Sequence, residues 1–302
     1  MGLAVGDAAG AFCECKAADD PLITGLDGQT LQPFTLRDGR TFPPGSVTDD
    51  TQMSVALSLA LVEKHGFDRE RVGTEYLRWH KSQPRGQGGT VRQALERLDA
   101  LRLGKIDAET VPGVPGALGT GTAMRAHPLG IVFIDAYQRD KACFDDALLT
   151  HASYEAVLGS QIVAAVTNAL IQRAEAKLSD EGRRDDCAKV VDLIPHAGQA
   201  MHKAPANTVL ALVQQALGCF LNASSYEEAV VAAVRMGGDT DTRASIVGGW
   251  AACVWPIPGR WLEVLEDRAM LEGLETGLFY VRGLLNPPPW WKLLRDVLGV
   301  VG

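Results

Sequence analysis

The chain has 302 residues, of which 46% are hydrophobic and 22% are charged, and its formal net charge is −8 at pH 7. This length can bury a large core in one or two domains, and the negative charge argues against nucleic acid as a partner. No apolar run of 18 residues predicts a membrane span. The start has no basic leader, and six scattered cysteines form no Cys-x-x-Cys pair, so we expect reduced thiols and a cytoplasmic protein.

The first predicted element is a helix over residues 2–12. Three glycines recur every four residues, namely Gly2, Gly6 and Gly10, and alanine fills half of the positions between them. This spacing leaves one face of the helix nearly bare and predicts very close packing against another helix. Asp7 lies on the same helix, and we expect it to be a structural hydrogen-bond acceptor rather than a catalyst. Residues 17–46 show no sustained period and predict a long irregular excursion, as lids and binding loops often are.

Two clusters of acids and hydroxyls each stand in front of an apolar helix. One is the run of residues 48–51, Thr-Asp-Asp-Thr, and the other is the run 239–242, Asp-Thr-Asp-Thr, which follows two glycines. Capping a helix needs only one such side chain, and carboxylates packed this densely repel one another unless a cation neutralises them. Oxygen ligands suit Mg²⁺, Mn²⁺ or Ca²⁺. We therefore expect the two helix starts to face each other across a metal centre; caps plus solvated charge are the alternative.

The remaining pattern is helical. The predicted helices cover residues 68–82, 90–103, 154–176, 183–203, 206–222 and 226–236, and the Trp- and Pro-rich end is interpreted as the surface finish of the fold. No stretch alternates with period two, and no linker or repeat divides the chain. The sequence therefore predicts an all-α protein with one domain, residues 1–302.

Two glycine-rich turns precede helical segments, at residues 85–90 and 119–125. Free backbone N–H groups at such turns can hold a phosphate, although a plain turn explains either segment equally well. His151 follows Thr150 just before a long helical run. A single histidine at a helix start is more often structural than a ligand.

Taken in order, these motifs resemble the ADP-ribosylglycohydrolase family. The matching stretches are Gly2-x-x-x-Gly6-Asp7-Ala8-x-Gly10 with Glu14, Gly45-Ser46-Val47-Thr48-Asp49-Asp50-Thr51-Gln52-Met53, Gly119 to Arg125 with Pro128-x-Gly130, Thr150-His151, and Gly237-Gly238-Asp239-Thr240-Asp241-Thr242. The turn over residues 85–90 is similar to the family's phosphate-side loop more loosely. Each motif is weak by itself, but five in order span nearly the whole chain.

The resemblance implies a compact helical fold with a central binuclear site for two Mg²⁺ ions, with Mn²⁺ as a substitute. The implied metal ligands are Thr48, Asp49, Asp50, Asp239, Asp241 and Thr242. The implied contacts to ADP-ribose are Gly88, Gly89, Gly119, Gly121, Thr122, Met124, Arg125 and His151. Glu14 is similar to the family's mobile glutamate, which reaches the metals or the substrate. Thr120 and Thr122 stand where family members often have Asn and Ser or Gly.

The implied reaction is hydrolysis of the glycosidic bond between ADP-ribose and an acceptor side chain of a protein. Its transition state has oxocarbenium character, and Asp50 and Glu14 are the two candidates for the general acid or base. Two alternatives remain at this point. One is a hydrolase of free ADP-ribose derivatives or of another nucleoside, and the other is a non-catalytic ADP-ribose-binding protein. The acceptor linkage, the target and the oligomeric state do not follow from the sequence.

Overall fold

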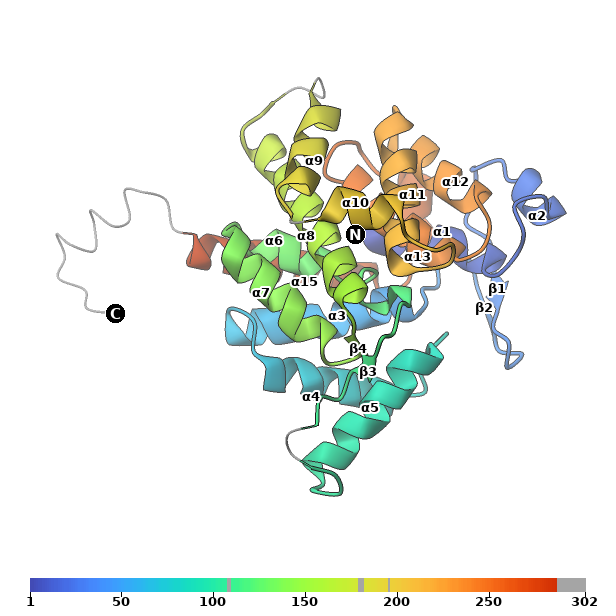
Figure 1. Cartoon of the computed structure of the whole chain (residues 1–302). Coiled ribbons are helices and arrows are strands. Elements are labelled where there is room, and N and C mark those ends of the chain that lie inside the picture. Colours follow the sequence, from blue (N-terminus) through green and yellow to red (C-terminus); the bar gives the residue numbers. More distant parts are fainter. Residues whose placement is uncertain (108–109, 179–181, 195, 287–302) are drawn as a thin grey trace.

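The computed structural model describes residues 1–107, 110–178, 182–194 and 196–286 (Figure 1). The predicted all-α class is confirmed. The helices are α1 (Gly2–Gly10), α2 (Pro21–Thr24), α3 (Asp49–Lys64), α4 (Arg69–His80), α5 (Gly89–Arg102), α6 (His127–Val132), α7 (Ala136–Ala147), α8 (Tyr154–Glu175), α9 (Arg183–Asp192), α10 (Ala197–His202), α11 (Val209–Asn222), α12 (Tyr226–Arg235), α13 (Thr240–Ala251), α14 (Gly259–Val264) and α15 (Arg268–Leu285). Two 3₁₀ turns, Ala11–Cys13 and Thr120–Thr122, join them.

Strands are few and very short. In the described ranges β1 (Phe34–Thr35) pairs antiparallel with β2 (Thr41–Phe42), and β3 (Val114–Pro115) pairs in parallel with β4 (His151–Ala152). The β3–β4 pair connects the segment before the glycine-rich turn at 119–125 to the segment that carries His151. Two parts of the chain that are distant in sequence, the segment before the turn at 119–125 and the segment of His151, thereby lie side by side.

The centre of the fold is the contact between α1 and α13. A Cβ at Gly6 would lie 2.0 Å from the Ala244 carbonyl oxygen, and a Cβ at Gly10 would lie 2.4 Å from the Thr240 carbonyl oxygen. Only glycine permits this approach, so the prediction of a bare helix face is confirmed. The Thr240 hydroxyl also donates to the Gly10 carbonyl at 2.8 Å. The contact fixes the beginning of α13 against the end of α1.

Helix α3 follows from local sequence signals at both ends. The Thr48 hydroxyl accepts from the Asp50 N–H at the start, and His65 ends the helix in the left-handed conformation at φ 53°. Most of its side chains from Asp49 to Leu61 are buried, including Met53 and Leu57. A helix that is buried on several sides while its first turn carries acids places those acids at the edge of the core.

The long helix α8 runs through the middle of the molecule, and Figure 1 shows α4 and α5 at one end with α9, α11 and α12 at the other. By length and hydropathy α8 could cross a membrane, but 78% of its apolar window is buried inside the protein. It therefore serves as a core helix. Asn168 joins α8 to the end of α6, since its amide donates to the carbonyls of Gly130 and Phe133 at 3.1 Å each.

Three expectations about the elements need correction. The segment 17–46 contains α2 and the β1–β2 pair rather than irregular chain alone. The helix predicted over 183–203 is two helices, α9 and α10, because His196 takes the left-handed conformation at φ 62°. The end of the chain is more than a surface finish, since α15 packs on α3 and α6. The Pro- and Trp-rich run 287–291 lies outside the described residues.

Candidate active site

A cavity of about 410 Å³ opens where α3, α5 and α13 begin. The predicted site residues that line it come from six separate segments: Glu14, Asp49, Asp50, Gly88, Gly89, Gly119, Gly121, Met124, His151, Asp239, Asp241 and Thr242. Three predicted residues, Thr48, Thr122 and Arg125, do not line the cavity. The fold thus brings together most of what the motifs indicated, from positions up to about 230 residues apart along the chain.

The first acidic segment is held in place by Asp7 of α1. Its carboxylate accepts from the backbone N–H of Thr48 at 2.9 Å and of Thr51 at 3.1 Å, and from the hydroxyls of the same residues at 2.8 and 2.6 Å. Two of the free N–H groups at the start of α3 are thereby satisfied from another helix. Asp7 is a structural acceptor, as its position predicts. The Thr48 hydroxyl is buried and lies 3.3 Å from Asp50 Oδ2, beside the cavity rather than in its wall.

The second acidic segment depends on a turn with two left-handed glycines. Gly237 and Gly238 have φ of 69° and 72°, values that favour glycine. The Gly238 N–H donates to the Lys16 carbonyl at 2.7 Å, and the Cys15 N–H donates to the Gly238 carbonyl at 2.8 Å. This antiparallel bridge holds the segment of Glu14 against the segment of Asp239. The Arg243 guanidinium closes the turn from behind by donating to the Gly237 carbonyl at 2.8 Å.

Burial and mutual repulsion dominate the electrostatics of the site. The pKa values of Asp49, Asp50 and Asp241 lie well above the usual range, first because burial disfavours the charged form and then because other carboxylates stand nearby. Burial and Asp239 also raise the pKa of Glu14. These carboxyl groups disfavour one another's ionisation, which is the situation that a bound cation would relieve.

The arrangement fits cations bound by oxygen. Asp50 Oδ1 is buried and accepts no hydrogen bond, so one lone-pair donor in the site has no protein partner. Within the described residues, no three side chains of His, Cys, Asp or Glu converge closely enough to hold an ion by themselves. A metal centre here would need the hydroxyls of Thr48 and Thr242 and water as further ligands, which is a donor set that Mg²⁺ accepts.

The two glycine-rich turns form the other side of the cavity. Gly88 precedes α5 at φ −64° and ψ 147°, and no side chain caps the helix. Its first N–H groups are therefore available to an anion at the mouth of a 14-residue helix. Across the cavity the Thr120 hydroxyl donates to Asp239 Oδ2 at 3.0 Å, which links the second turn to the acidic segment.

His151 lies against the second turn and is buried. A Cβ on Gly119 or Gly121 would lie 3.2 or 2.8 Å from its ring. Burial, with the nearby Arg125 cation, lowers the pKa of His151 to about 3, so the imidazole is neutral at pH 7. Its Nδ1 is 2.9 Å from the Thr150 hydroxyl, which already accepts from Arg125 at 2.8 Å. The Thr150 hydrogen can then point to Nδ1, which leaves Nε2 as the N–H donor.

Arg125 supports the site from outside it. The side chain is fully buried, pairs with Asp146 at 2.9 Å and donates to the Gly121 carbonyl at 2.7 Å. It also stacks over the ring of Tyr76 at 4.8 Å. Thr122 is likewise buried and donates to the Ala156 carbonyl at 2.7 Å. Neither side chain faces the cavity, so Arg125 acts on a ligand only through the turn and through His151.

Some residues that line the cavity were not among the predicted contacts. Gly86 and Thr90 belong to the glycine-rich turn at 85–90 but were not named as contacts, and Cys15, Val91 and Asn207 lie outside every motif. Cys15 is exposed and accepts from Arg37 Nη2 at 3.0 Å, directly beside Glu14. Its position after Glu14 was a usable signal. Asn207 arrives from the loop before α11 at φ 62°, and nothing in the sequence indicates that it returns to this cavity.

Comparison with known proteins identifies the family of the chain. The pattern of the family described as ADP-ribosylglycohydrolase matches residues 1–286. The chain belongs to the ADP-ribosylglycohydrolase family, and the protein is a hydrolase of that kind.

Two of the relatives are named as hydrolases of ADP-ribosyl groups. The chain is 25% identical to the ADP-ribosyl-[dinitrogen reductase] glycohydrolase of Rhodospirillum rubrum, over 90% of each chain. It is 24% identical to human ADP-ribosylhydrolase ARH3 over 88% of this chain and 87% of that one. An uncharacterized protein of Archaeoglobus fulgidus is 28% identical over 92% and 94%. A solved structure described as an ADP-ribosylglycohydrolase-related protein complex superposes with a TM-score of 0.72 at 26% identity, covering 93% of this chain and 95% of that one.

Proposed function

We propose that the protein is a Mg²⁺-dependent hydrolase that releases ADP-ribose from a modified side chain of a protein and so reverses mono-ADP-ribosylation. The observation that carries the proposal is the set of buried carboxyl groups at two facing helix starts, with Asp50 Oδ1 lacking any partner. Such a set has no structural use that a single cap would not serve. The acceptor linkage is left to experiment.

The ions would be held by two groups of three ligands, Thr48, Asp49 and Asp50 from α3 and Asp239, Asp241 and Thr242 from the start of α13. Two Mg²⁺ ions, or Mn²⁺ in their place, would bind ribose hydroxyls and acidify a water molecule. The N–H groups at the start of α5 and the turn at 119–121 would accept the pyrophosphate. His151, as a neutral N–H donor beside that turn, adds a hydrogen bond without a charge.

The proton transfers fall to this chain's carboxyl groups. Hydrolysis needs one group to take a proton from the attacking water and one to give a proton to the leaving acceptor. Asp50 is buried in the wall of the cavity, whereas Glu14 is exposed at its edge. The pKa of Glu14 is raised by burial and by Asp239, a direction that favours the general acid over the general base among its possible roles. Asp50 remains the alternative.

The test is incubation with peptides that carry ADP-ribose on arginine, on serine or on an acidic residue, with Mg²⁺ present, while free ADP-ribose is measured. We expect release from one of these linkages and no release in the presence of a chelator. Asp239→Asn should reduce both Mg²⁺ binding and release. Release that is insensitive to chelator, or unaltered by this variant, would contradict the metal centre.

The two alternative functions give different outcomes in the same experiment. A hydrolase of free ADP-ribose derivatives would leave all three peptides intact and would cleave a small ester of ADP-ribose. A binding protein would retain ADP-ribose in calorimetry and cleave nothing. The presence of all six implied ligands in the sequence, five of them in the wall of the cavity, favours catalysis over the binding protein.

A further inference from the structure

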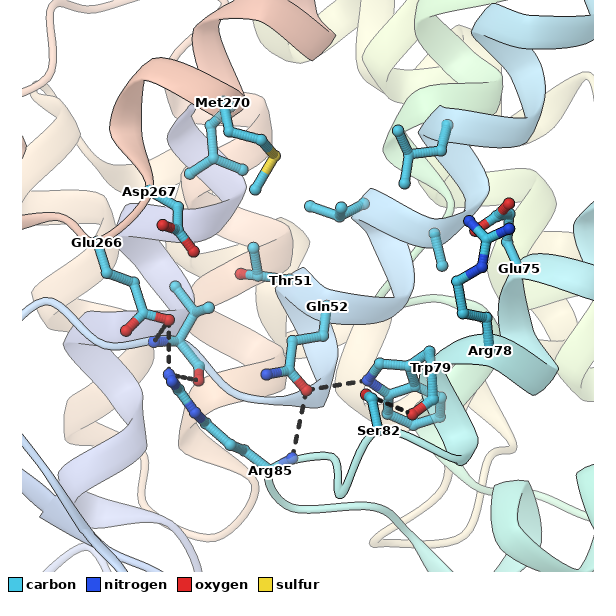
Figure 2. A pocket seen from close by; sticks show the side chains of 15 residues that line it. Thr51, Gln52, Glu75, Arg78, Trp79, Ser82, Arg85, Glu266, Asp267 and Met270 are labelled. Atoms are coloured by element: carbon cyan, nitrogen blue, oxygen red, sulfur yellow. Dashed lines mark hydrogen bonds and ion pairs between the residues drawn. The ribbon is translucent and has the colours of Figure 1, made fainter.

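A second cavity, of about 330 Å³, lies behind the first turn of α3, between α3, α4 and the start of α15. Figure 2 shows its wall. None of the twelve predicted residues that line the first cavity takes part in it. Two of its residues, Gln52 and Arg85, stand where it borders the segment that leads to the candidate site. They connect the acidic helix with the glycine-rich turn of residues 86–89, which we call the phosphate-side turn.

Gln52 joins three segments through one oxygen. It lies on α3 two residues after Asp50, and its Oε1 accepts from Trp79 Nε1 of α4 at 2.9 Å and from the Arg85 backbone N–H at 3.2 Å (Figure 2). The amide end of Gln52 is turned toward the second cavity. A single side chain therefore links the acidic helix, α4 and Arg85, the residue that precedes the phosphate-side turn.

Arg85 extends the same connection to the residue before Thr48. Its guanidinium pairs with Glu266, donates to the Val47 carbonyl at 3.3 Å and stacks on the Phe42 ring at 4.4 Å. The next residue, Gly86, has φ 77°, and a Cβ on it would lie 2.9 Å from Asp49 Oδ1. The phosphate-side turn thus lies directly against an implied metal ligand, and a small displacement of Arg85 would move it.

Packing does not hold this connection from behind, because the second cavity lies on that side. The side chains across the cavity, such as Leu59 of α3 and Met270 of α15, are both about two-fifths exposed. Interiors normally resist displacement through dense packing. Where packing is absent, hydrogen bonds decide the position of the turn. Gln87 holds its middle to His80 Nδ1 of α4 at 2.9 Å, and Gln52 and Arg85 hold the point at which the chain enters it.

We propose that Gln52 is a positioning residue for the candidate site. By holding the Arg85 N–H it fixes the phosphate-side turn against Asp49, in the arrangement in which Gly88 and Gly89 receive the pyrophosphate. This inference rests on the proposed function for the identity of the ligand. The positioning itself is a property of the chain and can be measured without any substrate.

The variant that tests it is Gln52→Leu, which has nearly the same volume and no acceptor. The variant loses the hydrogen bonds from Trp79 Nε1 and from the Arg85 N–H, and only the second bears directly on the turn. One hydrogen bond contributes about 0.5–1.5 kcal/mol net, so losing the one to Arg85 should speed amide exchange at the phosphate-side turn by about three- to tenfold. ADP-ribose affinity should fall by a similar factor, while Mg²⁺ affinity stays near that of the wild type. Gln52→Glu keeps an oxygen in the same place and should restore both. Gln52→Met, unbranched and without an acceptor, replaces Leu if that variant does not fold.

A matched control is Gln172→Leu on α8. Gln172 donates to Asn168 Oδ1 at 2.9 Å and is also partly buried, but it does not contact the candidate site. It should leave exchange at the phosphate-side turn unaltered. Equal exchange in wild type and Gln52→Leu, or an equal increase in Gln172→Leu, would overturn the positioning role. Failure of the Glu variant to restore protection would do the same.

The outcomes separate this inference from the proposed function. If wild-type protein neither binds ADP-ribose nor releases it from peptides, the proposed function fails, and the exchange data still decide whether Gln52 fixes the turn. If wild type is active and Gln52→Leu has faster exchange at the turn with unaltered ADP-ribose affinity, the turn does not serve the pyrophosphate. In that case the inference is wrong and the function stands.

Discussion

Asp7 offers a strict test of how the site is built, because one carboxylate accepts four hydrogen bonds. In Asp7→Ala the two hydroxyls can turn to other acceptors, as the Thr48 hydroxyl already lies 3.3 Å from Asp50 Oδ2. The backbone N–H groups of Thr48 and Thr51 cannot, since the first turn of a helix has no carbonyl for them. Each buried donor left without a partner costs about 1–3 kcal/mol. The free energy of unfolding should therefore drop by about 2–6 kcal/mol, a large share of the roughly 5–15 kcal/mol typical of a protein.

Asp7→Asn should behave very differently. Its oxygen can take the place of Oδ2, which accepts three of the four hydrogen bonds. Its amide group then faces the Thr48 hydroxyl, which can accept instead of donate. The change also removes a negative charge that raises the pKa values of Asp49 and Asp50. We expect the stability of metal-free Asp7→Asn to stay within about 1 kcal/mol of the wild type.

Urea unfolding of chelator-treated protein measures both variants, since the midpoint follows stability when the slope is constant. An Ala variant with the wild-type midpoint would show that the N–H groups find other partners. An Asn variant as unstable as the Ala variant would show that the charge, rather than the acceptor oxygen, holds α3. Either result would refute the reasoning.

Three further changes test other parts of the structure. Burial lowers the pKa of His127 from 6.5 to about 3, so the stability that the neutral imidazole contributes is complete above about pH 6.5 and is lost as the pH falls. Between about pH 6.5 and 5 the free energy of unfolding of the wild type should fall by about 2 kcal/mol more than that of His127→Gln in urea unfolding. The same pH dependence in both proteins would contradict this. Gly6→Ala forces a Cβ to 2.0 Å from a carbonyl oxygen and should lower the melting temperature sharply, whereas Gly273→Ala, with open space around it, should raise it slightly; similar shifts would mean that α1 and α13 can separate. Glu14→Ala should slow release of ADP-ribose by about 100-fold with Mg²⁺ still bound, whereas Asp241→Asn should lose both the release of ADP-ribose and the binding of Mg²⁺. Full turnover in Glu14→Ala would leave Asp50 as the acid or base.

The sequence predicted the parts of the fold in which a local pattern and its tertiary role coincide. Gly6 on α1 is an example, because a bare helix face has one obvious use. The helix α15 was missed although Leu271, Leu274 and Leu278 recur at helical spacing, since the flanking Pro- and Trp-rich runs suggested irregular chain. The break near His196 depends on a left-handed residue that single-sequence patterns rarely reveal.

In the site too, local sequence patterns predicted some residues, whereas others depend on tertiary structure. The acids at the starts of α3 and α13 were found because dense carboxylates before an apolar helix are unusual in any fold. The family resemblance implied that Arg125 contacts ADP-ribose. Its partner Asp146 lies on a different helix 21 residues away, and no local pattern indicates that the pair is buried. Asn207 joins the cavity through tertiary structure alone.

The bridge between Lys16 and Gly238 restricts how the site can open. A single antiparallel bridge joins Lys16 to Gly238, so the backbone beside Glu14 cannot withdraw without breaking the hydrogen bonds at 2.7 and 2.8 Å. A withdrawal of that kind would carry Asp239 with it and disturb the second acidic segment. Entry of a ligand past Glu14 must therefore proceed by rotation of the side chain over a stationary backbone. In hydrogen exchange, the amides of Cys15 and Gly238 should lose their protection together or not at all.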